Sequence, residues 1–328
     1  PQFEMIEAAR RLQDLEGCPK VEYTSADAFV QKLEAAAPTL PVYDGELYLE
    51  LHRGTLTAKQ QIKKNNRMAE NLLRMLELCL TRSAVTARTP VDGSALRPLW
   101  NTLLVNQFHD ILPGSCIAAA NDRSLHDMAE MLHTGSELLR SWFAPAQNCY
   151  TVLNPLDEPC RDVFYLPQIA SGFTLQNVVL ADGTAATAVY GLERPALGAA
   201  VLHFVPGEQP AQTSRFVYDG KTLTTPLLQV QLDELGRIPP LVTRADGMQW
   251  ADGPMNTLLM AEDVSAGWDG WDIDADCMMK LQPAARLTKQ TVTADGPQEF
   301  RLHSQYELGT ATILEQDMIF RAESTLVE

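Results

Sequence analysis

The chain has 328 residues, of which 45% are hydrophobic, and its formal net charge at pH 7 is −16. A single hydrophobic core rarely serves so long a chain, so the length predicts two or more domains. The acidic balance, with no run rich in Lys and Arg, argues against nucleic acid or an anionic membrane as a partner. No apolar run is long enough to predict a transmembrane helix.

Residues 1–50 hold two short amphipathic stretches. Residues 5–12 have helical spacing, and residues 25–33 continue at helical spacing behind Ser25, an N-cap candidate. Residues 21–23 between them are typical of a short strand. The alternation predicts a remnant or linker of an N-terminal β/α domain. Pro1 is not preceded by an initiator Met, and no signal-peptide pattern follows it, so we expect a piece of a longer chain.

Residues 51–145 contain three long amphipathic patterns, at about 57–80, 94–112 and 117–143. Apolar side chains recur every three to four residues in each of them, which is typical of a helix with one buried face. Pro-Val-Asp-Gly at 90–93 and Pro-Gly at 113–114 separate the patterns. We therefore predict a three-helix bundle of antiparallel neighbours.

Residues 146–328 consist of short strand-like runs broken by Pro, Gly and Asp, which predicts an antiparallel β-sandwich. The clearest runs are 150–153, 163–166, 177–180, 227–232, 288–292 and 318–327. A sandwich that ended just after the last run would leave an unpaired edge, so we expect this domain to be incomplete. The fold class is thus α+β and multidomain.

The six cysteines are widely spaced and form no Cys-x-x-Cys motif. This spacing disfavours a disulfide scaffold and a cysteine metal site. Idle thiols in a reducing compartment are the simplest interpretation, and we expect a cytoplasmic protein.

His109 and Asp110 form the first candidate site, at the predicted end of the second helix before Pro113-Gly114. The imidazole could bind zinc and the carboxylate could contact a polar substrate. A histidine that interacts with the helix dipole at a helix C-terminus is the alternative. The other five histidines, His52, His126, His133, His203 and His303, are scattered and show no ligand spacing.

Two further segments carry candidate polar sites. Polar and apolar side chains alternate in residues 46–55, which puts Glu46, Tyr48, Glu50 and His52 on one face of an extended segment. This face could line a pocket or be the solvated face of a strand. Residues 268–274, Trp-Asp-Gly-Trp-Asp-Ile-Asp, place aromatic rings beside carboxylates, as sugar sites do. The alternative for this segment is a tight loop in which Trp271 fills a domain junction.

Together these segments resemble the α-mannosidases of glycoside hydrolase family 38. The matching residues are 45–57, 66–70, 106–115, 152–156, 262–263 and 268–274. The chain departs from the family at Gly270, where Ala is more common, and at Val264-Ser265, where Pro is usual. The resemblance implies an N-terminal β/α domain, a three-helix middle domain and a galactose-mutarotase-like β-sandwich.

The resemblance also implies roles for individual residues. His109 would be a zinc ligand, and Asp110 would contact mannose hydroxyls. Trp271 and Asp272 are the further candidates for substrate binding. The nucleophile, the acid/base carboxylate and the other zinc ligands would belong to the N-terminal domain, so no catalytic residue is expected in residues 1–328.

The function that we expect is therefore part of a zinc-dependent retaining α-mannosidase acting on terminal α-mannosides. Its partners would be the α-mannoside and the missing catalytic domain, and a homo-oligomer remains open. A retaining glycosidase needs two carboxyl groups about 5–5.5 Å apart, and one histidine fills one of roughly four zinc positions. The isolated chain is thus expected to be inactive, without a tight zinc site.

Two alternatives use the sandwich alone. One is a carbohydrate-binding module without catalysis, which would need Trp271 for glycan binding. The other is a mutarotase-type isomerase, which would need a histidine and a carboxylate to converge within the sandwich, where His203 and His303 are the histidines.

Overall fold

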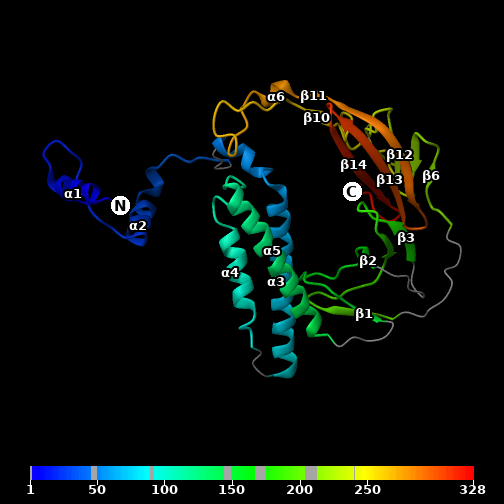
Figure 1. Cartoon of the computed structure of the whole chain (residues 1–328), viewed down its shortest axis with the longest axis horizontal. Coiled ribbons are helices and arrows are strands. Elements are labelled where there is room, and N and C mark those ends of the chain that lie inside the picture. Colours follow the sequence, from blue (N-terminus) through cyan, green and yellow to red (C-terminus); the bar gives the residue numbers. More distant parts are fainter. Residues whose placement is uncertain are drawn as a thin grey trace. The chain divides into compact units, whose positions relative to one another are not determined.

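The computed structural model describes residues 2–45, 50–88, 92–143, 149–166, 175–203, 213–239 and 241–328. The chain divides into two compact units, Pro1–Leu49 and Glu50–Glu328. These ranges contain helices and antiparallel sheets joined by turns and loops (Figure 1). The three domain ranges predicted from the sequence stay a prediction.

The first unit contains two helices, α1 (Phe3–Arg11) and α2 (Ala26–Ala36), each followed by a 3₁₀ turn, Leu12–Asp14 and Ala37–Thr39. Ser25 caps α2 as expected, because its hydroxyl accepts a hydrogen bond from the Ala28 amide at 3.2 Å. The strand expected at residues 21–23 is wrong. An extended segment needs a neighbouring strand for its backbone groups, and the described residues of this unit offer none.

The second unit begins with a 3₁₀ segment, Glu50–Leu56, and three packed helices. These are α3 (Gln60–Ala87), α4 (Leu96–Asn106) and α5 (Ala118–Ser141), which lie side by side in Figure 1. They share one apolar cluster, made of Ala69, Leu73, Leu76, Leu96, Leu99, Leu103, Met128 and Met131. Burying each such leucine is worth about 1.5–3 kcal/mol, so this cluster holds the three helices together.

The end of α4 differs from the prediction. The helix stops at Asn106 instead of continuing to residue 112. The buried side-chain amide of Asn106 donates to the backbone carbonyl of Thr102 at 2.8 Å. The backbone N–H of Phe108 donates to the carbonyl of Val105, three residues back. The backbone thus tightens and leaves the helical path. Residues 107–114 consequently form a turn, and His109 lies in this turn and not on the helix.

The strands within the described ranges form five antiparallel sheets. β1 (Cys149–Leu153) pairs with β5 (Ala199–His203), and β10 (Leu259–Met260) pairs with β11 (Gln282–Pro283), which follows the short helix α6 (Cys277–Lys280). The three-stranded sheet β2-β4-β3 holds Phe164–Leu166, Ala185–Val189 and Leu175–Val179. The four-stranded sheet holds β6 (Val217–Tyr218), β7 (Thr222–Thr224), β8 (Leu228–Gln231) and β9 (Val242–Thr243). The longest strands, β12 (Ala285–Asp295), β13 (Glu299–Leu308) and β14 (Thr312–Arg321), form a meander.

Five of the six expected runs coincide with strands β1, β2, β3, β8 and β12. The sixth, 318–327, is wrong as one strand, because β14 ends at Arg321 and the chain then turns back. Val327 bridges to Phe320, and Glu328 exchanges two backbone hydrogen bonds with Ile319. The outer edge of β14 is therefore paired at this end.

The strand β13 separates two different environments, because its side chains alternate between the two faces of the sheet. Phe300 and Leu302 face the four-stranded sheet and are 1% exposed in an apolar core. Glu299 and Arg301 point the other way, toward β2 and β3, and are also buried. The meander is thus covered on both faces, by an apolar layer on one and a polar network on the other.

Candidate functional site

The turn at residues 107–114 presents His109 and Asp110 to solvent. The His109 side chain is 72% exposed, and its Nε2 lies 3.5 Å from an oxygen of Asp110. The ring of Phe108 lies against the imidazole, with centroids 4.4 Å apart. A cavity of about 420 Å³ opens beside His109, and Lys63 and Gln107 are among its lining residues. The imidazole can therefore accept a ligand from outside the turn.

Lys63 on α3 holds one side of this turn. Its ammonium donates to three backbone carbonyls, those of Ala58 (2.5 Å), Leu112 (3.0 Å) and Pro113 (3.1 Å). An ammonium has three hydrogens to donate, and these contacts use all of them. Partial burial lowers the pKa of Lys63 from its usual range. The lysine thus fastens the turn to the start of α3.

A network of amide and carboxylate groups holds the other side. The Gln107 amide donates to Asn66 at 3.0 Å and to Glu70 at 3.1 Å. Asn66 also donates to Glu70, at 2.9 Å. Residues 66–70, which belong to the family resemblance, therefore fix the first residue of the His109 turn.

Gly114 closes the turn in a conformation that favours glycine. Its φ is +86°, and a Cβ there would lie 2.7 Å from the carbonyl oxygen of Ala58. Because the turn backbone passes so close to Ala58 and Lys59, only glycine fits without displacement.

The loop at residues 268–272 docks on the segment that contains His52 and Gly54. The Gly54 amide donates to the Trp271 carbonyl at 3.0 Å. The ring of Trp271 meets that of His52 edge-on, with centroids 4.9 Å apart. Arg53 lies 3.7 Å from the carboxylate of Asp272. The Trp-Asp-Gly-Trp-Asp and His-Arg-Gly-Thr segments, distant in sequence, are therefore one assembly.

The same loop also reaches Ser115, the residue that follows the His109 turn. A Cβ on Gly270 would lie 3.8 Å from the Cα of Ser115, which is ordinary contact distance. The Ser115 hydroxyl in turn is 3.5 Å from the backbone oxygen of Asp110. The structure thus brings the three motif segments of the sequence into one region.

The surroundings of Trp271 and Asp272 combine features of both interpretations of this loop. Trp271 is half-buried against His52, as a junction residue would be, and its amide donates to Trp268 at 2.7 Å. Trp268 is 79% exposed, so it is the more accessible ring. Sequence reasoning did not single out Trp268 as a site residue. Its φ of +59° marks the tight turn that exposes it.

The metal-ligand prediction rests on His109 alone. Among the described residues, the one group of three or more close potential ligands is His126, Asp127 and Glu130 on α5, which does not contain His109. Asp127 there already accepts two bonds of 2.8 Å from Arg123. The imidazole of His109 fits zinc chemically, but the described part of the chain does not complete its coordination. The six cysteines are free thiols.

Comparison with known proteins assigns the family. Residues 50–144 match the family described as the α-mannosidase middle domain. Human α-mannosidase 2C1 is 30% identical over 288 residues, which cover 83% of this chain and 26% of the human protein. The chain belongs to the α-mannosidase family. It spans about a quarter of the length of this relative. Dictyostelium discoideum α-mannosidase G is 39% identical over 117 residues, 36% of this chain and 11% of that protein.

Two solved structures from Enterococcus faecalis share the fold of this family member. One, a protein of glycoside hydrolase family 38, has a TM-score of 0.58 and 11% identity, and the match covers 98% of this chain and 48% of that one. The other, an α-mannosidase from strain V583, has a TM-score of 0.62 and 12% identity over 99% of this chain and 48% of that one. Both matches concern the fold.

The sheet of β12, β13 and β14 also contains a histidine–carboxylate pair that the sequence did not reveal. His303 Nδ1 lies 2.7 Å from Asp317, and the two residues are register partners on β13 and β14. Asp317 also lies 3.4 Å from Arg301 and lines a cavity of about 650 Å³, whose wall does not include His303. Asp317 therefore lies between Arg301 and His303 and can pair with both.

No helix within the described ranges combines the length and the apolar character that crossing a bilayer requires.

Proposed function

We propose that the chain is part of a zinc-dependent, retaining α-mannosidase that hydrolyses terminal α-mannosides of glycans or oligosaccharides. The family relationship over 83% of the chain supports the substrate class. The observation that carries the site is the exposed His109 imidazole on a turn braced by Lys63 and Gln107. A metal ligand needs this kind of fixed support, because its orientation sets the geometry of the site.

In this proposal His109 supplies one zinc ligand, and the remaining ligands come from beyond the described residues. Bound zinc would act as a template and stabilise developing charge near the sugar hydroxyls. Asp110, whose side chain is 49% exposed, is placed to accept a hydrogen bond from a hydroxyl of the same sugar. No nucleophile or acid/base residue is assigned to this chain.

We assign Trp271 and Asp272 to the edge of the substrate site. In this proposal the side chain of Asp272, beside Arg53, accepts hydrogen bonds from sugar hydroxyl groups. Docking on Gly54 and His52 would keep both residues in place while substrate enters and leaves.

The finer domain assignment belongs to the same proposal. Residues 51–145 would be the three-helix middle domain and residues 146–328 a galactose-mutarotase-like sandwich. Residues 1–50 would link them to a β/α catalytic domain, in a cytoplasmic enzyme.

The proposal is tested with the purified 328-residue chain. We expect no hydrolysis of an aryl α-mannoside above the rate in buffer, and less than stoichiometric zinc after dialysis. A complete α-mannosidase serves as the positive control in both assays. Turnover by the chain, or one tightly held zinc per chain, would show that the chemistry resides within residues 1–328 and refute the assignment.

A further inference from the structure

A cavity of about 820 Å³ with a mixed polar and apolar lining lies where strand β2, the end of β4 and the turn after β14 meet. Its lining includes Arg161, Tyr165, Tyr190, Gln298, Arg321 and Ser324. None of the lining residues belongs to the His109 turn or to the loop at 268–272. We propose that this cavity binds a neutral hexose unit of a glycan, an inference that rests on the proposed mannoside function. Its size lies within the range of small-molecule sites, about 300–1,000 Å³.

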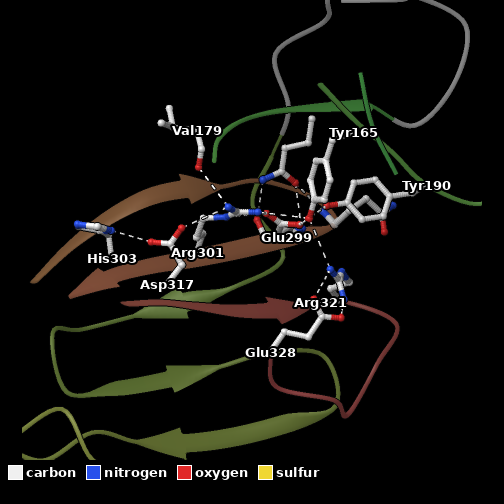
Figure 2. Close-up of polar contacts among 11 residues, drawn as sticks. Tyr165, Val179, Tyr190, Glu299, Arg301, His303, Asp317, Arg321 and Glu328 are labelled. Atoms are coloured by element: carbon white, nitrogen blue, oxygen red, sulfur yellow. Dashed lines mark hydrogen bonds and ion pairs between the residues drawn. The ribbon is translucent and has the colours of Figure 1, made fainter. Parts of the chain in front are cut away.

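Two tyrosines form a fixed wall of this cavity. Both hydroxyls donate to the same oxygen of the buried Glu299, Tyr165 at 2.9 Å and Tyr190 at 3.0 Å (Figure 2). Glu299 is held in turn by Arg301, whose Nη2 lies 2.9 Å from the other carboxylate oxygen. Because the hydroxyls are held in place, the rings are oriented before any ligand arrives. Such preorganisation lowers the entropic cost of binding.

The two arginines and two of the three carboxylates that line the cavity are already paired, and the third carboxylate, Asp162, adds negative charge. Arg321 makes a two-pronged ion pair with Glu328, and Arg161 pairs with Glu193. Glu323 accepts from Arg215 at 2.5 Å. Recognition of phosphate or carboxylate ligands generally uses arginines that are free for the ligand. The pairing therefore favours a neutral, polyhydroxylated ligand over an anion.

Two uncharged side chains remain available for such a ligand. The backbone of Gln298 is engaged, since its N–H donates to Gln176 at 3.1 Å and its carbonyl accepts from Ala322 at 2.8 Å. No described residue is bonded to the Gln298 side-chain amide. The Ser324 hydroxyl accepts from the Leu326 amide at 3.0 Å and keeps its own hydrogen for donation. A sugar hydroxyl both donates and accepts, which an amide and a hydroxyl can match.

The test is an NMR titration of the ¹⁵N-labelled 328-residue chain with methyl α-D-mannopyranoside and with a linear mannotriose. We expect the amide signals of Gly191, Gln298 and Ser324 to shift as either sugar is added. Unmoved signals up to about 10 mM sugar, where millimolar affinity would saturate, would overturn the proposal. Shifts confined to Gly54 and Gly270 would overturn it too, because they would place the sugar at the loop of residues 268–272.

A substitution separates direct contact from an indirect effect. Gln298→Ala removes only a side chain without a described hydrogen bond, so the fold is expected to persist. Losing one hydrogen bond should weaken mannotriose binding about three- to tenfold. The matched control is Gln305→Ala at the far end of β13, which should bind as the unsubstituted chain does. Equal affinity of Gln298→Ala and the unsubstituted chain would contradict the proposed contact.

The ligand class is tested with mannose 6-phosphate. Tighter binding of this anion than of methyl α-D-mannopyranoside would overturn the neutral class. The titration needs no hydrolysis, so its failure leaves the mannosidase proposal standing. Conversely, if the complete protein did not hydrolyse α-mannosides, the mannosidase proposal would fail. Sugar binding seen in the titration would still stand as a result about this cavity.

Discussion

The backbone amide of Gly54 donates a hydrogen bond to the carbonyl of Trp271 at 3.0 Å, and so joins the 3₁₀ segment before α3 to the loop between β10 and α6. This bond positions Trp271 and Asp272 through backbone geometry. It also gives the His-Arg-Gly-Thr segment a structural role that the family resemblance alone did not specify. A segment next to the helices and a loop next to the sheets of the second unit are in contact at this point.

Gly54→Ala should loosen this contact. The added Cβ would lie 3.2 Å from the Trp271 and Asp272 carbonyl oxygens, closer than most side-chain contacts. Overpacking of this kind costs about 1–3 kcal/mol, and urea unfolding should show a loss in this range. The control is Gly267→Ala, just before the loop at residues 268–272, where an added Cβ would have nothing within 4 Å. This variant should change the free energy of unfolding little. Equal stability of the two variants would show that the contact is not tight.

Gly114→Ala should lower the free energy of unfolding by more than the cost of placing alanine at a positive φ. Its Cβ would meet the Ala58 carbonyl oxygen at 2.7 Å, whereas Gly183, with a similar φ of +80°, has nothing within 4 Å. Gly183→Ala measures the conformational cost alone, about 1 kcal/mol. Chemical denaturation should place Gly114→Ala at least about 1 kcal/mol below this control. A difference near zero would mean that the turn shifts freely away from Ala58.

Lys63→Met should release the His109 turn. The substitution keeps the length of the side chain but leaves three carbonyl oxygens without their donor. Amide hydrogen exchange in residues 107–114 should become faster, and the free energy of unfolding should fall by about 2–3 kcal/mol. The neighbouring, exposed Lys64→Met should leave both quantities unchanged. Unaltered exchange in Lys63→Met would remove the lysine from the support of the turn.

Alkaline pH should test the tyrosine–glutamate network. Burial, and then the nearby Glu299 carboxylate, raises the pKa of Tyr190 well above its usual range. The folded state therefore holds this proton longer than the unfolded state, so the contribution to stability is complete below about pH 10 and falls as pH rises further. Absorbance at alkaline pH should show a tyrosine fraction that ionises only on unfolding, and Tyr190→Phe should reduce this fraction. Reversible ionisation of all tyrosines in the folded chain near pH 10 would contradict the network.

The sequence predicted which helices and strands exist better than it predicted the residues at which they end. The buried stripe of α3, with Ile62, Ala69, Leu73 and Leu76, follows the helical repeat that the sequence displays. The sequence did not predict the end of α4, because the side-chain amide of Asn106 bonds there to the backbone carbonyl of Thr102. The course after β14 was missed because it depends on a bridge to Phe320 that residue periodicity does not encode.

The candidate site could be read from the sequence only as separate motifs. No sequence pattern predicts that Lys63 donates to the backbone of the His109 turn. Every residue has a backbone carbonyl, so the sequence does not mark which ones a lysine will contact. The Glu299 network joins side chains from three strands and a loop, and its partner Tyr165 lies far away in the sequence. A register prediction for the hairpin of β13 and β14 would have found His303 beside Asp317.

We propose that His109 is a zinc ligand of a complete α-mannosidase. Its most direct test is the zinc content per chain of the full reading frame that contains residues 1–328, compared between the unsubstituted protein, His109→Ala and the exposed-histidine control His133→Ala. We predict about one zinc per chain, with hydrolysis of an aryl α-mannoside, in the unsubstituted protein and the control, and the loss of both in His109→Ala. Full zinc content and turnover in His109→Ala would contradict the account.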